Sequence, residues 1–203
     1  RPLVLAARQH GWPGPGAETS CVGAELEGAV DVSTLGAAPR RVHFKADRVD
    51  RSGAGLWLVD YKTGKAKTQK SLLKNVARGE ALQAAAYAFG TGGEGRYLYL
   101  AGDAGGGSAV SAEACDAELR AAFEVSVGTV LAALGTGSFF PRLMEPGKDV
   151  SSGRCEYCEV REACLQGDGG ARARLGRWSE AGVARHAAEA AALALWRLPG
   201  ASG

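Results

Sequence analysis

The sequence predicts an α/β domain in which a mixed central sheet is flanked by helices, and three hydrophobic patterns along the chain support this fold class. Residues 41–50 alternate polar and apolar side chains with period two, as a half-buried strand does. Residues 56–62 form a compact apolar run that ends in polar residues, which is typical of a central strand. Residues 71–90 change to the helical period, so strands and helices alternate within one domain.

The other strands are predicted around this central pair. Residues 52–55 supply a turn, so we expect the strands on either side of it to form an antiparallel hairpin. A first strand is expected over 18–26, after the segment 11–16, whose prolines and glycines cannot continue a regular element. A further strand is expected over 96–100.

Three segments are predicted to be helical. Residues 71–90 form either one helix or two helices that are split at Gly79. A long helix is expected from roughly 111 to 134, with its N-cap at or beside the first of these residues. The alanine-rich residues 172–198 are also expected to be helical, with an interruption at Gly182.

Composition limits the classes of protein to which the chain can belong. With 203 residues, of which 46% are hydrophobic, the chain can bury one sizeable core. The formal net charge is only +2, so any contact with nucleic acid must be local and not a general electrostatic coating. We expect no membrane span and, without a secretory signal, a cytoplasmic location. The opening residues from Arg1 resemble the interior of a longer chain.

Two acidic side chains and a lysine stand near the ends of the predicted hairpin strands. Asp47 and Asp60 lie thirteen positions apart on consecutive strands, so they can meet across a short turn. Because strand side chains alternate, Lys62 projects from the same face as Asp60, and Tyr61 faces away and leaves its carbonyl available to a metal. Mg²⁺ and Mn²⁺ take such oxygen ligands and activate water for phosphodiester hydrolysis. The pattern predicts a divalent-metal site in which Lys62 assists the attacking water.

Three segments resemble, in the same order, motifs of RecB-type nucleases in the PD-(D/E)XK superfamily. They are Phe44-Lys45-Ala46-Asp47-Arg48-Val49-Asp50, Leu58-Val59-Asp60-Tyr61-Lys62-Thr63-Gly64 and Leu82-Gln83-Ala84-Ala85-Ala86-Tyr87. The resemblance implies a restriction-endonuclease-like core and metal-dependent cleavage of DNA. It also implies catalytic roles for Asp47, Asp60, Lys62, Gln83 and Tyr87, the last two of which share one helix face and can contact the site or a DNA phosphate.

Two departures from the family pattern are visible. Ala46 stands where relatives commonly have glycine, and no residue clearly corresponds to the upstream histidine that many relatives use as a metal ligand. We assign this role neither to His10 nor to His43. Asp50 and Arg51 are expected to be solvated.

The chain has five cysteines, an odd number that argues against a disulfide framework. Cys155, Cys158 and Cys164 form a Cys-x2-Cys-x5-Cys group, a spacing that suits either zinc or an iron–sulfur cluster. Its position after a RecB-like core resembles the AddB-type arrangement, which implies a [4Fe-4S] cluster with a fourth cysteine from well before the core. That ligand is expected upstream of residue 1, with Cys21 as the fallback, and Cys115 is expected to be a small buried side chain.

The resemblance also implies an organisation and a role for the whole chain. Residues 1–150 would form the nuclease core, and residues 151–203 the cysteine segment with a helix that packs on it. The chain would hydrolyse single-stranded DNA in double-strand-break repair and recombination, as an exonuclease more than an endonuclease, beside a helicase subunit or an upstream helicase-like region. Two rival hypotheses remain: a catalytically inactive nuclease-like module that binds DNA or a partner, and a zinc-stapled interaction domain. Basic residues after the second hairpin strand could follow a DNA backbone or form a solvated face; they are Lys65, Lys67, Lys70, Lys74 and Arg78.

Overall fold

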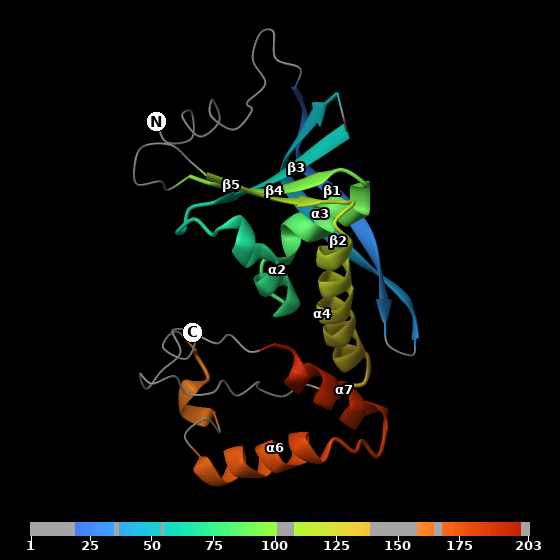
Figure 1. Cartoon of the computed structure of the whole chain (residues 1–203), viewed down its shortest axis with the longest axis vertical. Coiled ribbons are helices and arrows are strands. Elements are labelled where there is room, and N and C mark those ends of the chain that lie inside the picture. The colour runs from blue at the N-terminus through green and yellow to red at the C-terminus, as the bar shows by residue number, and fades with distance from the viewer. Residues whose placement is uncertain are drawn as a thin grey trace. The chain divides into compact units, whose positions relative to one another are not determined.

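In the computed structural model, the chain divides into two compact units, Arg1–Gly128 and Thr129–Gly203. Figure 1 shows the helices and strands of the two units. The described residues are 19–34, 37–53, 55–100, 108–138, 158–164 and 168–199.

The first unit is built on a five-stranded mixed sheet with the strand order β1-β2-β3-β4-β5 (Figure 1). Strands β1 and β2, β2 and β3, and β4 and β5 pair antiparallel, whereas β3 and β4 are parallel. The predicted hairpin and the mixed sheet are therefore confirmed. The strands are β1 (Ser20–Thr34), β2 (Ala37–Ser52), β3 (Gly55–Lys62), β4 (Glu94–Tyr99) and β5 (Ser108–Glu113).

Two helices make the crossover that the parallel pair requires. These are α2 (Gln69–Ala77) and α3 (Leu82–Thr91), and Figure 1 shows both on the same side of the sheet. Helix α3 contacts all five strands and forms the main cover of that face. A glycine, Gly95, lets α3 approach β4, because a Cβ atom there would overlap the carbonyl oxygen of Ala84. The observed layers of sheet and helix confirm the predicted α/β class.

The structure corrects several predicted boundaries. The helical segment is split, as one of the two alternatives expected, and Gly79 lies between α2 and α3 with a left-handed φ of 77°. Residues 108–113 form strand β5, so the helix expected from residue 111, α4, begins later and spans Ala117–Gly135. Its actual N-cap is Asp116, whose carboxylate accepts a hydrogen bond of 2.9 Å from the backbone N–H of Leu119.

Near Asp47, the side chains of β2 do not alternate regularly between the two faces of the sheet. Ala46 and Val49 both pack in one cluster with Leu58 and Tyr87, although residues three apart on a regular strand face opposite sides. On the neighbouring strand, Glu25 adopts a left-handed φ of 55°. The register of β1 and β2 is not shifted between Ala24 and Leu26, so the irregularity is local to the backbone beside Asp47, a candidate site residue.

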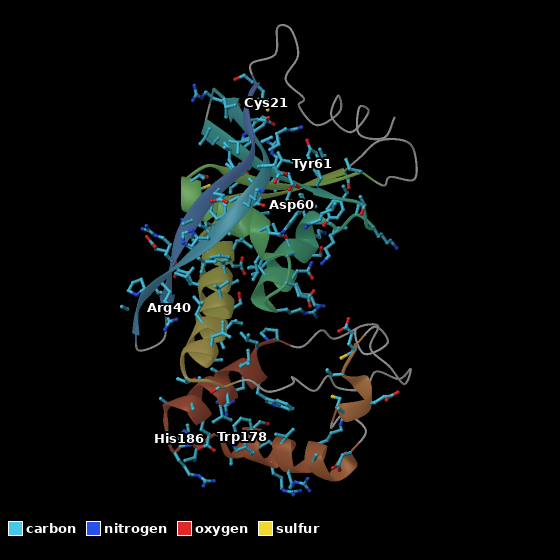
Figure 2. The ribbon with its side chains drawn as sticks, turned by 180° about the vertical axis from the view of Figure 1, so that it is seen from behind. Cys21, Arg40, Asp60, Tyr61, Trp178 and His186 are labelled. Atoms are coloured by element: carbon cyan, nitrogen blue, oxygen red, sulfur yellow. The ribbon has the colours of Figure 1, made fainter. Side chains whose placement is uncertain are left out.

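The second unit contains a short 3₁₀ turn and two helices. The predicted interruption at Gly182 is confirmed, since this residue has a left-handed φ of 66° at the end of the first helix. Trp178 donates a hydrogen bond of 2.8 Å from its indole N–H to Glu189 of the next helix (Figure 2 labels Trp178). None of the helices in the described residues is long and apolar enough to cross a membrane. The elements are η1 (Arg161–Ala163), α6 (Gly169–Ala181) and α7 (Ala187–Arg197).

Candidate active site

Asp47 and Tyr61 meet where β2 and β3 separate. The regular pairing of these strands ends at Arg48 and Val59. Beyond it, the backbone N–H of Tyr61 donates a hydrogen bond of 2.8 Å to Oδ2 of Asp47. The carboxylate therefore takes the place of the next backbone acceptor in the ladder, which fixes it against the end of β3.

The carbonyl groups at this end of β3 point to alternate sides. The carbonyl of Lys62 accepts a hydrogen bond of 2.8 Å from Leu100, on the side of β4. Because successive backbone carbonyls of a strand point in opposite directions, the carbonyl of Tyr61 points toward the β2 side, where Asp47 lies. Figure 2 labels Asp60 and Tyr61 at this end of the sheet. That this carbonyl binds a metal stays a prediction.

Asp60, Lys62 and Gln83 form a closed triangle of polar contacts. Lys62 Nζ lies 2.7 Å from Oδ2 of Asp60 and donates a hydrogen bond of 3.2 Å to Oε1 of Gln83. Gln83 in turn donates from Nε2 to Oδ1 of Asp60 at 2.9 Å. The predicted common face of Asp60 and Lys62 is thus observed, and Gln83 reaches them from the first turn of α3.

Asp60 is a buried carboxylate, and its burial disfavours the ionised form. It is 5% exposed, and burial raises its pKa above the ordinary value, while Lys62 acts in the opposite direction and Asp47 adds to the rise. Its Oδ2 atom has the Lys62 ammonium nearby but no well-directed hydrogen bond. A divalent cation would compensate this buried charge, so the residues present fit a metal.

Gln83 is positioned by a strained backbone. Ala81, immediately before α3, adopts φ 51° and ψ 46°, a left-handed conformation that is unfavourable for a residue with a side chain. The cost is about 1 kcal/mol, and such strain is found where the surrounding structure holds a functional segment in place. The turn at Ala81 starts α3 so that its second residue is Gln83, beside Asp60.

Tyr87 lies inside the core. Its side chain is fully buried, and its hydroxyl donates a hydrogen bond of 2.7 Å to the backbone carbonyl of Lys45. Burial raises its pKa, and the charges of Asp60 and Asp47 raise it further. Tyr87 therefore anchors β2 two residues before Asp47. Its predicted contact with DNA or with the reacting groups stays a prediction.

The expectation that Asp50 is solvated is wrong. Asp50 is fully buried and Arg48 is 5% exposed, and their side chains form an ion pair of 2.8 Å between Nη2 and Oδ2. Arg51 is exposed, as expected. A sequence signal for the pair exists, because opposite charges two positions apart on a strand project from the same face. Burial raises the pKa of Asp50, while Arg48 and then Arg96 oppose the rise.

The candidate ligands are oxygen atoms. Two carboxylates and one backbone carbonyl match the donor preference of Mg²⁺ and Mn²⁺. Within the described ranges, no group of three or more His, Cys, Asp or Glu side chains gathers around one point. His43 is exposed on β2, and His10 lies outside the described residues.

A family model for the PD-(D/E)XK nuclease superfamily matches residues 5–165. The chain belongs to the PD-(D/E)XK nuclease superfamily. The match spans the sheet and the site, and it confirms the restriction-endonuclease-like class of the mixed sheet with its helices. Membership makes this a nuclease domain of a superfamily that generally uses divalent metals such as Mg²⁺ or Mn²⁺ and acts on DNA. No curated protein matches the chain.

The cysteine group lies partly in the described residues. Cys158 is exposed and Cys164 is half-buried, on either side of η1, whereas Cys155 lies outside the described residues. Cys21 is exposed on β1. Cys115 is exposed as well, with its Sγ 3.5 Å from Oε2 of Glu113, so the expectation that it is buried is wrong.

The segment that leaves the site carries exposed lysines and is held against the sheet. Gln69 makes two hydrogen bonds with the backbone of Ser111 on β5, from Nε2 to the carbonyl at 2.6 Å and from the N–H to Oε1 at 3.0 Å. This side chain thus pairs with the strand as a neighbouring backbone would. The exposed lysines on the segment are Lys65, Lys67, Lys70 and Lys74.

Proposed function

We propose that this domain is a Mg²⁺- or Mn²⁺-dependent deoxyribonuclease whose metal is held by Asp47, Asp60 and the carbonyl of Tyr61. The observation that carries the proposal is the hydrogen bond from the Tyr61 N–H to Asp47, beside the ion pair of Asp60 and Lys62. Bound there, the metal would polarise a phosphate and lower the pKa of a water molecule.

The protein residues then have separable tasks. Lys62 holds an ammonium group beside Asp60, where it can orient the attacking water and stabilise charge that develops on the phosphate. The Gln83 amide contacts both groups and fixes their separation. Tyr87 supports the site by anchoring β2 through Lys45.

We propose single-stranded DNA as the substrate and exonucleolytic cleavage as the reaction, in a RecB/AddB-like helicase-nuclease that acts in double-strand-break repair. The ordered motifs around Asp47, Asp60 and Gln83 support this subtype. The exposed lysines after β3 support a phosphate-binding path next to Lys62. The partner would be a helicase subunit or a helicase-like region of a longer chain.

Site variants test the catalytic proposal. Asp60→Asn and Lys62→Met should each lower Mg²⁺-dependent cleavage of end-labelled single-stranded DNA by about a hundredfold or more. Asp31→Asn is the matched control, because it removes an exposed ion pair with Arg41 at the other end of the β1–β2 hairpin.

Wild-type protein that binds DNA but cleaves nothing with Mg²⁺ or Mn²⁺ would favour the inactive module. Resistance of circular single strands would identify an exonuclease.

We propose further that Cys155, Cys158 and Cys164 ligate a [4Fe-4S] cluster, in a cysteine segment that belongs to residues 151–203 and follows a nuclease core of residues 1–150. The spacing of the three cysteines supports the proposal. Anaerobically purified protein should be brown and rich in iron, and Cys158→Ser should lose both properties while Cys115→Ser keeps them. A colourless, zinc-rich preparation would contradict the cluster.

A further inference from the structure

A buried charged pair lies directly behind the candidate active site. Arg48 and Asp50 project from the same part of β2, and their paired side chains are 6% and 1% exposed. Isolated buried charges cost several kcal/mol, and a buried ion pair is often no more stabilising than apolar residues of the same volume. The pair therefore calls for a structural or functional reason other than general stability.

The pair continues into Tyr61, the residue between Asp60 and Lys62. Arg48 donates from Nη1 to the Tyr61 hydroxyl at 2.9 Å, and its guanidinium carbon lies 5.7 Å from the centre of the tyrosine ring. The ring itself packs against Val59 and Leu98. Asp50, Arg48 and the Tyr61 hydroxyl thus form one connected chain of polar contacts.

These polar contacts and the hydrogen bond between Tyr61 and Asp47 both join β2 to β3, one through the side chain of Tyr61 and the other through its backbone. Arg48 follows Asp47, and Tyr61 follows Asp60, so each partner is the direct neighbour of a candidate metal ligand. The backbone N–H of Tyr61 is held by the Asp47 carboxylate, while the Tyr61 hydroxyl is held by Arg48. Both contacts hold Tyr61, which lies just beyond the last regular pair of β2 and β3, where the ladder no longer fixes the distance between the strands.

We propose that Arg48, held by Asp50, is a positioning residue that acts through the Tyr61 hydroxyl to set the spacing of Asp47, Asp60 and the Tyr61 carbonyl for a divalent metal. The inference rests on the proposed metal-dependent function and names the residues that prepare its site. Groups that orient metal ligands without touching the metal commonly change its affinity by about tenfold or more when they are removed.

Tyr61→Phe tests the proposal with a small change. It removes only the hydroxyl and keeps the ring against Val59 and Leu98, so the fold should be retained. The dissociation constant for Mn²⁺, measured from the free-Mn²⁺ electron paramagnetic resonance signal, should rise roughly tenfold. The Mg²⁺ concentration for half-maximal DNA cleavage should rise by a similar factor, and kcat at saturating Mg²⁺ should stay within about threefold of wild type.

The control is Thr91→Ala, which removes polar contacts at the C-terminal end of α3 in the same unit. The Thr91 hydroxyl donates a hydrogen bond of 2.7 Å to the carbonyl of Tyr87 and accepts one of 3.3 Å from the N–H of Gly93, eight or more residues beyond Gln83 along the chain. This variant should lower the melting temperature without changing Mn²⁺ affinity. Equal loss of Mn²⁺ affinity in both variants would show a general effect of stability and overturn the positioning role.

A second variant tests the role of the guanidinium. Arg48→Lys keeps a positive charge for Asp50 but lacks the planar group that contacts Asp50 and Tyr61 together, so it should weaken Mn²⁺ binding as Tyr61→Phe does. Wild-type Mn²⁺ affinity in a folded Tyr61→Phe would overturn the inference while leaving the nuclease proposal intact. Failure of the wild-type protein to bind Mn²⁺ would instead overturn the proposed function itself.

Discussion

Gly95→Ala should separate helix α3 from the sheet and so disturb the site without touching it. The added Cβ atom would overlap the carbonyl oxygen of Ala84 and lie 2.9 Å from Cβ of Tyr87. Both obstacles belong to α3, and the first is backbone, so no side-chain rotation relieves them. The helix must move away from β4, by an amount on the order of 1 Å, before normal packing distances return.

The expected loss of stability follows from the packing contacts that this displacement breaks. Overpacking of a core costs about 1–3 kcal/mol, and a backbone clash lies at the upper end of that range. For a chain of this size, 3 kcal/mol lowers the melting temperature by roughly 6–12 °C. The hydrogen bond from Gln83 to Asp60, now 2.9 Å, would lengthen beyond about 3.5 Å, the limit of a useful contact.

Two measurements check this expectation. Calorimetry or circular dichroism gives the melting temperature, and cleavage of labelled single-stranded DNA, assayed well below the transition, gives the activity. Gly176→Ala in helix α6 is the control, because nothing lies within 4 Å of the added Cβ. It should be neutral or stabilise by up to about 1 kcal/mol. A Gly95→Ala protein with wild-type melting temperature and activity would refute the close-packing argument.

Three further predictions concern the site and its surroundings. Tyr87→Phe should lower the free energy of unfolding by about 1 kcal/mol, because the Lys45 carbonyl loses a buried donor, and folded protein should keep cleavage within tenfold of wild type; a hundredfold loss with an unchanged melting temperature would show that the hydroxyl takes part in the reaction. Asp60→Asn should melt above wild type at pH 8 in EDTA, because a raised pKa means that the folded state disfavours ionised Asp60. This advantage should shrink as the pH falls through the raised pKa and wild-type Asp60 gains its proton, and a difference that grows toward acid would contradict the assignment. Replacing Lys70 and Lys74 together by Gln should reduce the salt dependence of single-stranded DNA binding by roughly one unit of slope, measured by fluorescence anisotropy, and an unchanged slope would mean that these lysines form a solvated face.

The central part of the fold was predictable from sequence because its elements have strong local patterns. The alternation over residues 41–50 and the apolar run over 56–62 gave β2 and β3, and Gly79 marked the break between α2 and α3. Strand β5 was not predicted, because Ser108–Glu113 is short and Val110 is its only residue with a strong preference for strands. It forms because it can pair with β4, and it is also held by Gln69, which lies 42 residues away along the chain.

The candidate site was predictable in part, for a related reason. Strand alternation correctly placed Asp60 and Lys62 on one face, and helical spacing placed Gln83 and Tyr87 on one helix. Sequence periodicity could not show that Tyr87 is buried, since that depends on how close α3 lies to the sheet. The burial of Asp50 does not follow from its own charge, because it depends on the ion pair that Asp50 forms with Arg48.

Crystals grown without metal and then soaked in Mn²⁺ offer the most direct test of the metal site. We expect one anomalous peak at roughly 2.0–2.3 Å from an oxygen of Asp47, an oxygen of Asp60 and the carbonyl oxygen of Tyr61. The same soak of Asp60→Asn crystals should give no peak there. Manganese bound elsewhere, at a concentration that supports DNA cleavage in solution, would contradict the assignment of these three groups as the catalytic metal site.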